Sequence, residues 1–146
     1  SLRMAASWWG YDLQTSNFHN IWLESFVISF KLWCEPARMI SKPVLGMQDD
    51  GITQTFIGIG AFDNQFEAES LLKYIKTKFC RILLAILKVT QGNKSETWEY
   101  VPMQDFSKTS DIDWNKSIEE IDKQLYRKYD LTKEDIAFIN KRIADI

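Results

Sequence analysis

The pattern of apolar and polar residues changes from strand-like to helical within the first half of the chain. Residues 26–33 (FVISFKLW) are β-branched and aromatic and alternate in part, and residues 52–62 (ITQTFIGIGAF) are rich in Thr, Ile and Phe, which is typical of strands. Between them, residues 39–45 contain a proline and predict at best an edge strand, and residues 48–51 carry an Asp-Gly turn pair. Residues 97–101 predict one more strand. These segments predict a small, mostly antiparallel sheet.

One long amphipathic helix is predicted after residue 62. Asp63 or Asn64 can cap its N-terminus, and Gly92 is a natural C-terminal breaker. At a helical period of 3.6 residues, the apolar residues fall within an arc of roughly 120° and the basic residues lie opposite, within an arc of roughly 140°. The apolar set is Leu71, Leu72, Ile75, Phe79, Ile82, Leu83 and Ile86, and the basic set is Lys73, Lys76, Arg81 and Lys88.

Two shorter helices are predicted in the tail. Their apolar stripes are Ile118, Ile121, Leu125 and Tyr129, then Ile136, Ile139 and Ile143. Between the stripes, Thr132 can cap the second helix, and Glu134 and Asp135 would lie in its first turn, which is typical of a helix N-terminus.

The fold class that these patterns predict is α+β, with a small mostly antiparallel sheet, one long amphipathic helix and a C-terminal helical pair. Residues 1–25 are aromatic without a clean period, and we expect a connector or the end of a preceding domain there. We expect residues 26–106 to form the main domain and residues 107–146 the helical tail.

Positive charge is concentrated in the predicted long helix. Between Leu71 and Ser95 the chain carries six basic residues and no acidic one, whereas residues 1–70 carry four basic against eight acidic residues and residues 96–146 carry eight against twelve. One interpretation is a solvated outer face, whose lysine stems cover apolar surface. The other is contact with the phosphates of a nucleic acid. The absence of any acid favours the second, because an ordinary solvated face mixes both signs.

Few residues offer reaction chemistry. The two cysteines, Cys34 and Cys80, are far apart, and the single histidine, His19, has no motif around it, which argues against zinc and against a Ser/His/Asp site. Gly58-Ile59-Gly60 lacks the third glycine of a dinucleotide loop, and Asp111-Ile112-Asp113 lacks a third carboxylate for magnesium. Low cysteine usage and the absence of a long apolar run favour a reduced, cytoplasmic setting without a membrane span.

The residues expected to contact DNA are the basic ones of this region and polar residues of neighbouring loops. Amide side chains in residues 90–95 (TQGNKS) are of the kind that hydrogen-bond to base edges. The candidate DNA-binding set is Lys42, Gln54, Lys73, Lys76, Lys78, Arg81, Lys88, Gln91, Asn93 and Lys94. We predict no catalytic residue and no metal ligand.

Several stretches, in their order and spacing, are similar to one protein family. They are residues 40–45 (ISKPVL), 53–57 (TQTFI), 74–79 (YIKTKF), 100–106 (YVPMQDF), 110–114 (SDIDW) and 121–129 (IDKQLYRKY). Through them the chain resembles, over roughly residues 26–146, the C-terminal portion of bacterial adenine-specific DNA methyltransferases of restriction–modification systems. In combined type II restriction–modification enzymes that portion is the target-recognition region.

The resemblance implies a module for sequence-specific recognition of double-stranded DNA, with residues 26–106 as its target-recognition domain. In this family methyl transfer takes place in a preceding domain, which binds S-adenosylmethionine and positions adenine with an Asn-Pro-Pro-aromatic motif. The prolines Pro36, Pro43 and Pro102 are isolated, so the chain lacks that motif and no catalytic residue is implied. The implied partners are double-stranded DNA and a catalytic methyltransferase domain or subunit, and S-adenosylmethionine is a cofactor of the parent enzyme only.

Two other functions stay open on the sequence. One is a protein-interaction module that docks its basic helix on an acidic partner. The other is a nuclease with a carboxylate site that no motif discloses. Binding that weakens steeply with salt distinguishes phosphate contact from the protein-docking alternative.

Overall fold

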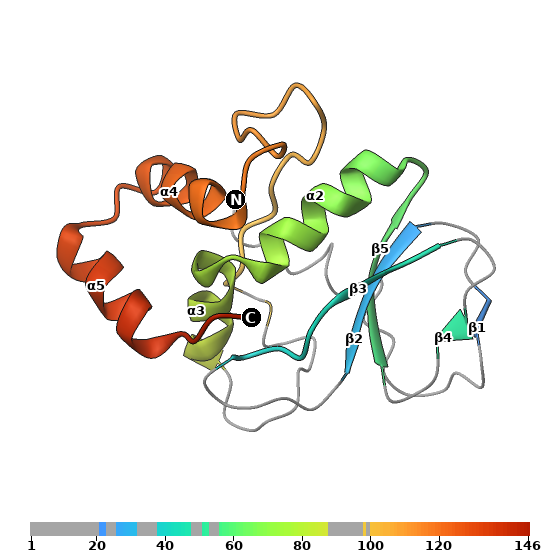
Figure 1. The fold of residues 1–146 in the computed structure, drawn as a ribbon, viewed down its shortest axis with the longest axis horizontal. Helices are drawn as coiled ribbons and strands as arrows, with labels where there is room; N and C mark the ends of the chain where they lie inside the picture. The colour runs from blue at the N-terminus through green and yellow to red at the C-terminus, as the bar shows by residue number, and fades with distance from the viewer. Residues whose placement is uncertain are drawn as a thin grey trace.

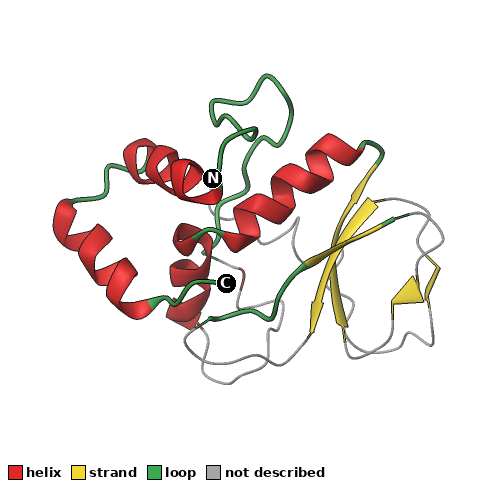
Figure 2. Ribbon diagram, in the orientation of Figure 1, coloured by secondary structure: helices red, strands yellow, loops and turns green. Residues whose placement is uncertain are grey.

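The fold combines strands and helices, in agreement with the predicted α+β class (Figures 1 and 2). The structure is a computed structural model and describes residues 21–22, 26–31, 38–47, 51–52, 56–87, 98 and 100–146. In chain order its elements are β1 (Ile21–Trp22), β2 (Phe26–Lys31), β3 (Val44–Gly46), β4 (Gly51–Ile52), β5 (Phe56–Phe62), α2 (Gln65–Lys76), α3 (Lys78–Leu87), α4 (Ile118–Lys128) and α5 (Lys133–Arg142).

Three of the strands pair antiparallel in the order β3-β2-β5, while β1 and β4 pair separately. In the three-stranded sheet Ile28 lies opposite both Leu45 and Ile59, and Ile28 and Ile59 are buried. The proline-bearing segment ends in β3 at the sheet's edge, where proline's missing N–H is tolerated. The helix α2 contacts β2, β3 and β5, so the sheet and this helix share one core.

The predicted long helix is two helices, and that part of the prediction is wrong. The chain is extended at Thr77 (φ −61°, ψ 148°), which ends α2, and α3 begins at the next residue. The Thr77 hydroxyl donates to the Tyr74 carbonyl oxygen at 2.6 Å and accepts from the Cys80 N–H at 3.2 Å. One side chain therefore serves the end of one helix and the start of the next, as threonine can at a helix terminus.

The N-terminus of α3 is also capped from a distant part of the chain. The two carboxylate oxygens of Asp122, on α4, accept the N–H groups of Lys78 and Phe79, each at 2.9 Å. A carboxylate at a helix N-terminus pairs with otherwise unbonded N–H groups and with the positive end of the helix dipole. Asp122 therefore fixes both the start of α3 and the position of α4 against it.

The segment between α3 and α4 is held to α2 by aromatic side chains. Tyr74, Phe106 and Trp114 form a cluster with ring centroids 5.2–6.1 Å apart. The Tyr74 hydroxyl donates to the Pro102 carbonyl oxygen at 2.7 Å, and the Trp114 indole N–H donates to the Asp105 carbonyl oxygen at 2.8 Å. The strand predicted for residues 97–101 does not form in its described residues. Residue 98 lies in a 3₁₀-helical turn, residue 100 in a turn and residue 101 in a bend.

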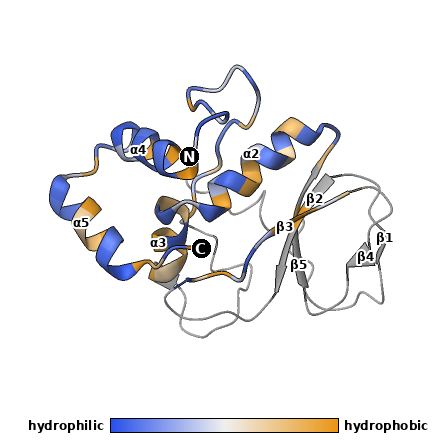
Figure 3. Cartoon of the chain, in the orientation of Figure 1, coloured by the Kyte–Doolittle hydropathy of each residue, from blue (hydrophilic) through white to orange (hydrophobic). Residues whose placement is uncertain are grey.

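The tail forms two helices at the predicted positions, each with a capping box. Ser117 and Glu120 cap α4, and Thr132 and Asp135 cap α5. Figure 3 shows both helices as mostly hydrophilic ribbons interrupted by short hydrophobic stretches. Those stretches include Ile121, Leu125 and Ile139 of the hydrophobic core.

Asp130 ends α4 in the left-handed conformation (φ 53°). Its N–H donates to the Arg127 carbonyl oxygen at 3.3 Å and the Leu131 N–H donates to the Tyr126 carbonyl oxygen at 2.9 Å, the two bonds of a Schellman motif. Glycine is the usual residue at this position because it has no Cβ. The Asp130 carboxylate also lies at the negative end of the helix dipole.

We expect Asp122→Ala to lower the free energy of unfolding by about 3 kcal/mol, because it leaves two N–H groups of α3 without a partner. Urea denaturation at neutral pH measures this loss. The matched control is Asp63→Ala, an exposed carboxylate before α2, which should change stability by less than about 0.5 kcal/mol. Equal losses for the two variants would contradict the capping role.

We expect Asp130→Gly to be more stable than Asp130→Ala, with a free energy of unfolding about 1 kcal/mol higher. Glycine adopts the left-handed conformation without a Cβ clash, whereas alanine does not. Both variants remove the same carboxylate, so the comparison isolates the backbone effect. Thermal and urea unfolding of the pair measure it, and an Ala variant as stable as the Gly variant would contradict the assignment.

Candidate functional site

Three segments that are far apart in the sequence meet at the α2–α3 junction. They are residues 38–42, residues 76–81 and residues 140–145. The Arg81 guanidinium links all three, because it donates to the carbonyl oxygens of Lys76, Arg38 and Ala144. In Figure 1 the C-terminus of the chain lies beside α3. This junction gathers most of the described part of the predicted basic face.

Arg81 belongs to the interior of the junction. Arg81 is only 2% exposed to solvent, although the helical wheel drawn from the sequence predicts it on the outer face of the helix. Its Nε donates to the carbonyl oxygens of Lys76 at 3.2 Å and Thr77 at 3.3 Å. Burial lowers the pKa of Arg81, and nearby acidic groups, Asp122 and Asp145 among them, counteract this shift. Arg81 therefore holds the junction together and does not present its charge to a ligand.

Two of the predicted lysines also bind within the protein. The Lys73 ammonium donates to the carbonyl oxygens of Trp114 at 2.8 Å and Lys116 at 3.2 Å. The Lys78 ammonium lies 3.0 Å from an Asp145 carboxylate oxygen. Lys73 thus fastens the segment before α4 to α2, and Lys78 is paired with the C-terminal segment.

Lys42 and Lys76 are different, because they bring like charges together. The pKa of Lys76 is lowered, first by burial and second by the charge of Lys42. Lys42 is exposed and Lys76 is half-buried. No carboxylate of the described residues forms an ion pair with either ammonium. A bound anion would relieve this repulsion, so the pair is the best candidate anion site at the junction.

The remaining predicted contacts lie outside the described residues. They are Gln54, Lys88, Gln91, Asn93 and Lys94. Their contribution to a DNA-binding surface stays a prediction.

Sequence reasoning missed Asp122 as the centre of the junction. Burial raises the pKa of its carboxyl above the usual value, although the N–H groups of Phe79 and Lys78 and the nearby charges act in the opposite direction. Burial raises the pKa of the Tyr126 hydroxyl, and the charge of Asp122 raises it further. One signal was available in the sequence, since an aspartate at position 122 interrupts the apolar stripe of Ile118, Ile121 and Leu125.

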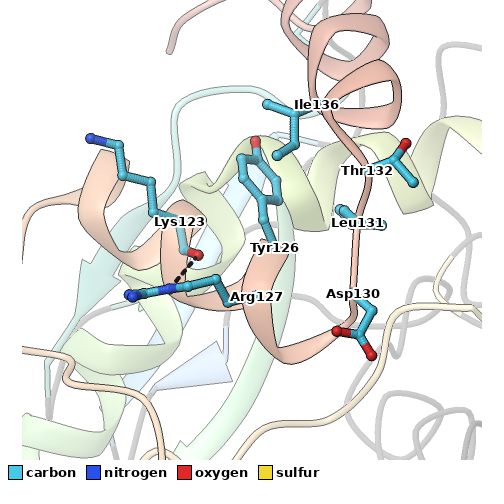
Figure 4. A pocket seen from close by; sticks show the side chains of 7 residues that line it. All are labelled: Lys123, Tyr126, Arg127, Asp130, Leu131, Thr132 and Ile136. Carbon is cyan, nitrogen blue, oxygen red and sulfur yellow. Dashed lines mark hydrogen bonds between the residues drawn. The ribbon is translucent and has the colours of Figure 1, made fainter.

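A second surface feature is an open groove between α4 and α5 with a volume of about 800 Å³. Figure 4 shows the Tyr126 ring between Arg127 on one side and Leu131 and Thr132 on the other. The residues that line it are Lys123, Tyr126, Arg127, Asp130, Leu131, Thr132 and Ile136. The lining combines apolar side chains with two cations and one carboxylate, a mixture also found at surfaces that bind peptides.

Among the described residues, no group of three or more His, Cys, Asp or Glu residues is placed to hold a metal ion. The Cys80 thiol is buried, and burial raises its pKa well above the usual value, which disfavours the nucleophilic thiolate. None of the described helices is both long enough and apolar enough to cross a membrane.

The chain was compared with protein-family models, curated proteins and solved structures, and nothing in the three comparisons matches it. The similarity to adenine-specific DNA methyltransferases therefore stays a hypothesis that depends on the sequence stretches alone.

Proposed function

We propose that this chain is a module that recognises double-stranded DNA in a sequence-specific manner on behalf of an adenine-specific (N6) DNA methyltransferase. The observation that carries the DNA-binding part is the Lys42–Lys76 pair. The two cations come from segments over 30 residues apart in sequence, and the charge of Lys42 adds to the effect of burial in lowering the pKa of Lys76. Repulsion between like charges destabilises the free protein, and a phosphate bound by both lysines would offset it.

The position of the pair suits a contact to the DNA backbone. Lys76 lies in the last turn of α2, where a lysine is also favoured by the helix dipole. Lys42 lies just before the edge strand β3. Phosphate contacts of this kind fix the register of a protein on the duplex but carry no sequence information.

Reading of the bases falls to polar side chains outside the described residues. We assign that role to Gln54, Gln91 and Asn93, whose amide groups can donate to and accept from base edges. Lys88 and Lys94 would add charge contacts. The recognition surface then consists of the described cation pair and loops that flank it in sequence.

The methyltransferase part of the proposal derives from the resemblance. A recognition module needs phosphate anchors and base-reading side chains, and the reaction machinery can lie elsewhere. S-adenosylmethionine and the reacting groups would belong to a catalytic domain or subunit that acts with this chain in the bacterial cytoplasm.

A protein-interaction module is the second candidate, and the α4–α5 groove is the observation that favours it. Its apolar side chains and the cations Lys123 and Arg127, which outnumber the single carboxylate of Asp130, suit an acidic segment of a partner protein. The two functions are compatible, since a recognition module has to bind its catalytic partner as well as DNA.

We expect Lys42→Ala and Lys76→Ala each to weaken binding to duplex DNA, and the double variant to flatten its salt dependence. The slope of log K against log salt should become less negative by about 0.9 for each phosphate contact that is lost. Fluorescence anisotropy with a duplex oligonucleotide at several salt concentrations measures both quantities.

The control for this experiment is Lys133→Ala, an exposed lysine at the start of α5. It removes the same charge outside the three segments of the junction and should leave the slope unchanged. Failure of the wild-type chain to bind duplex DNA at low salt, or equal slopes for all variants, would overturn the proposed anchor.

A further inference from the structure

The C-terminal segment is held against α3 by contacts of Ala144 and Asp145 with two α3 side chains. Ile143 is buried, with 1% exposure, and its N–H donates to the Ile139 carbonyl oxygen at 2.9 Å. The next residue, Ala144, accepts a hydrogen bond from the buried Arg81 guanidinium. These contacts place Asp145 within 3.0 Å of the Lys78 ammonium.

The two members of the Lys78–Asp145 pair are not equally accessible. The side chain of Lys78 is 23% exposed, whereas that of Asp145 is 93% exposed. The Lys78 ammonium also lies 3.4 Å from the Asn140 amide oxygen. The cation is thus held in place by its surroundings, while its carboxylate partner is almost fully in water, where an ion pair contributes little.

Such an arrangement is open to exchange of the anion. A phosphate approaching from solvent can take the place of the Asp145 carboxylate without moving Lys78, because only the exposed partner has to leave. The exchange replaces a singly charged carboxylate by a group with more acceptor oxygens, which pairs well with an ammonium. Asp145 is ionised at neutral pH, since its pKa is lowered by its hydrogen bond to Lys78 and by the charge of that lysine.

We propose that Lys78 is a further phosphate-binding position of the junction and that Asp145 occupies it as a competing anion supplied by the chain itself. The proposal extends the DNA-binding surface of the proposed function, on which it rests, from Lys42 and Lys76 to the first residue of α3. Removing the charge of Asp145 frees Lys78 for phosphate. The C-terminal segment therefore lowers the affinity of the junction for polyanions.

The test compares Asp145→Asn with Glu134→Gln in the full chain. Both variants remove one exposed carboxylate and keep the size of the side chain, but Glu134 lies in the first turn of α5 and has no ion pair with the junction cations of the described residues. The ligands are a duplex oligonucleotide and inorganic tripolyphosphate, each titrated at low salt. We expect Asp145→Asn to bind both ligands about two- to fivefold more tightly than Glu134→Gln, a factor typical of an exposed ion pair.

A double variant, Asp145→Asn with Lys78→Met, identifies the cation that is freed. This double variant should lose the gain in affinity that Asp145→Asn alone produces, because the two substitutions act on the same Lys78–Asp145 ion pair. If Asp145→Asn and Glu134→Gln bind both ligands equally, or if the gain survives the loss of Lys78, the inference is overturned.

The two ligands separate this inference from the proposed function. A gain for tripolyphosphate, with no binding of duplex DNA by any variant, would support the anion site at Lys78 and overturn the DNA-binding function. If the wild-type chain binds DNA but removal of the Asp145 charge does not raise the affinity, the proposed DNA-binding function stands. The assignment of Asp145 as a competing anion is then overturned.

Discussion

The contact between the Asp122 carboxylate and the start of α3 determines how the rest of this fold is arranged. Because the carboxylate accepts the N–H groups of Lys78 and Phe79, α3 can begin directly after the single extended residue that ends α2. The same carboxylate belongs to α4, so the tail is joined to the domain by a polar contact inside an apolar interface. A helix terminus buried without such a partner would leave its N–H groups unbonded at considerable cost.

This junction divides the cations of the basic region into two kinds. Arg81 is drawn inside, where it bonds to carbonyl oxygens of three segments, and Lys73 fastens the neighbouring segment to α2. Lys42 and Lys76 remain at the surface without a carboxylate partner among the described residues. A basic stretch of sequence therefore supplies both the interior bonding of the fold and the charge available to a ligand.

The prediction of one long helix failed for a reason specific to Thr77. No glycine or proline marks the break, and threonine is only a weak helix breaker. The apolar period continues across it, since both α2 and α3 bury apolar faces in the same core. Once the chain is extended at Thr77, however, the wheel of α2 no longer describes α3, and Arg81 moves from the expected outer face to the interior.

The sequence by itself determined features that arise from neighbouring residues. These are the strands β2 and β5, the two tail helices, the capping of α5 at Thr132, and the concentration of positive charge between Leu71 and Ser95. These depend on interactions within a few positions of each other, which periodicity and capping patterns record. Only the tertiary structure decided the break at Thr77 and which cations stay exposed. Those depend on Asp122 and on the C-terminal segment, which lie over 40 residues away in sequence and act only when the folded chain brings them to the junction.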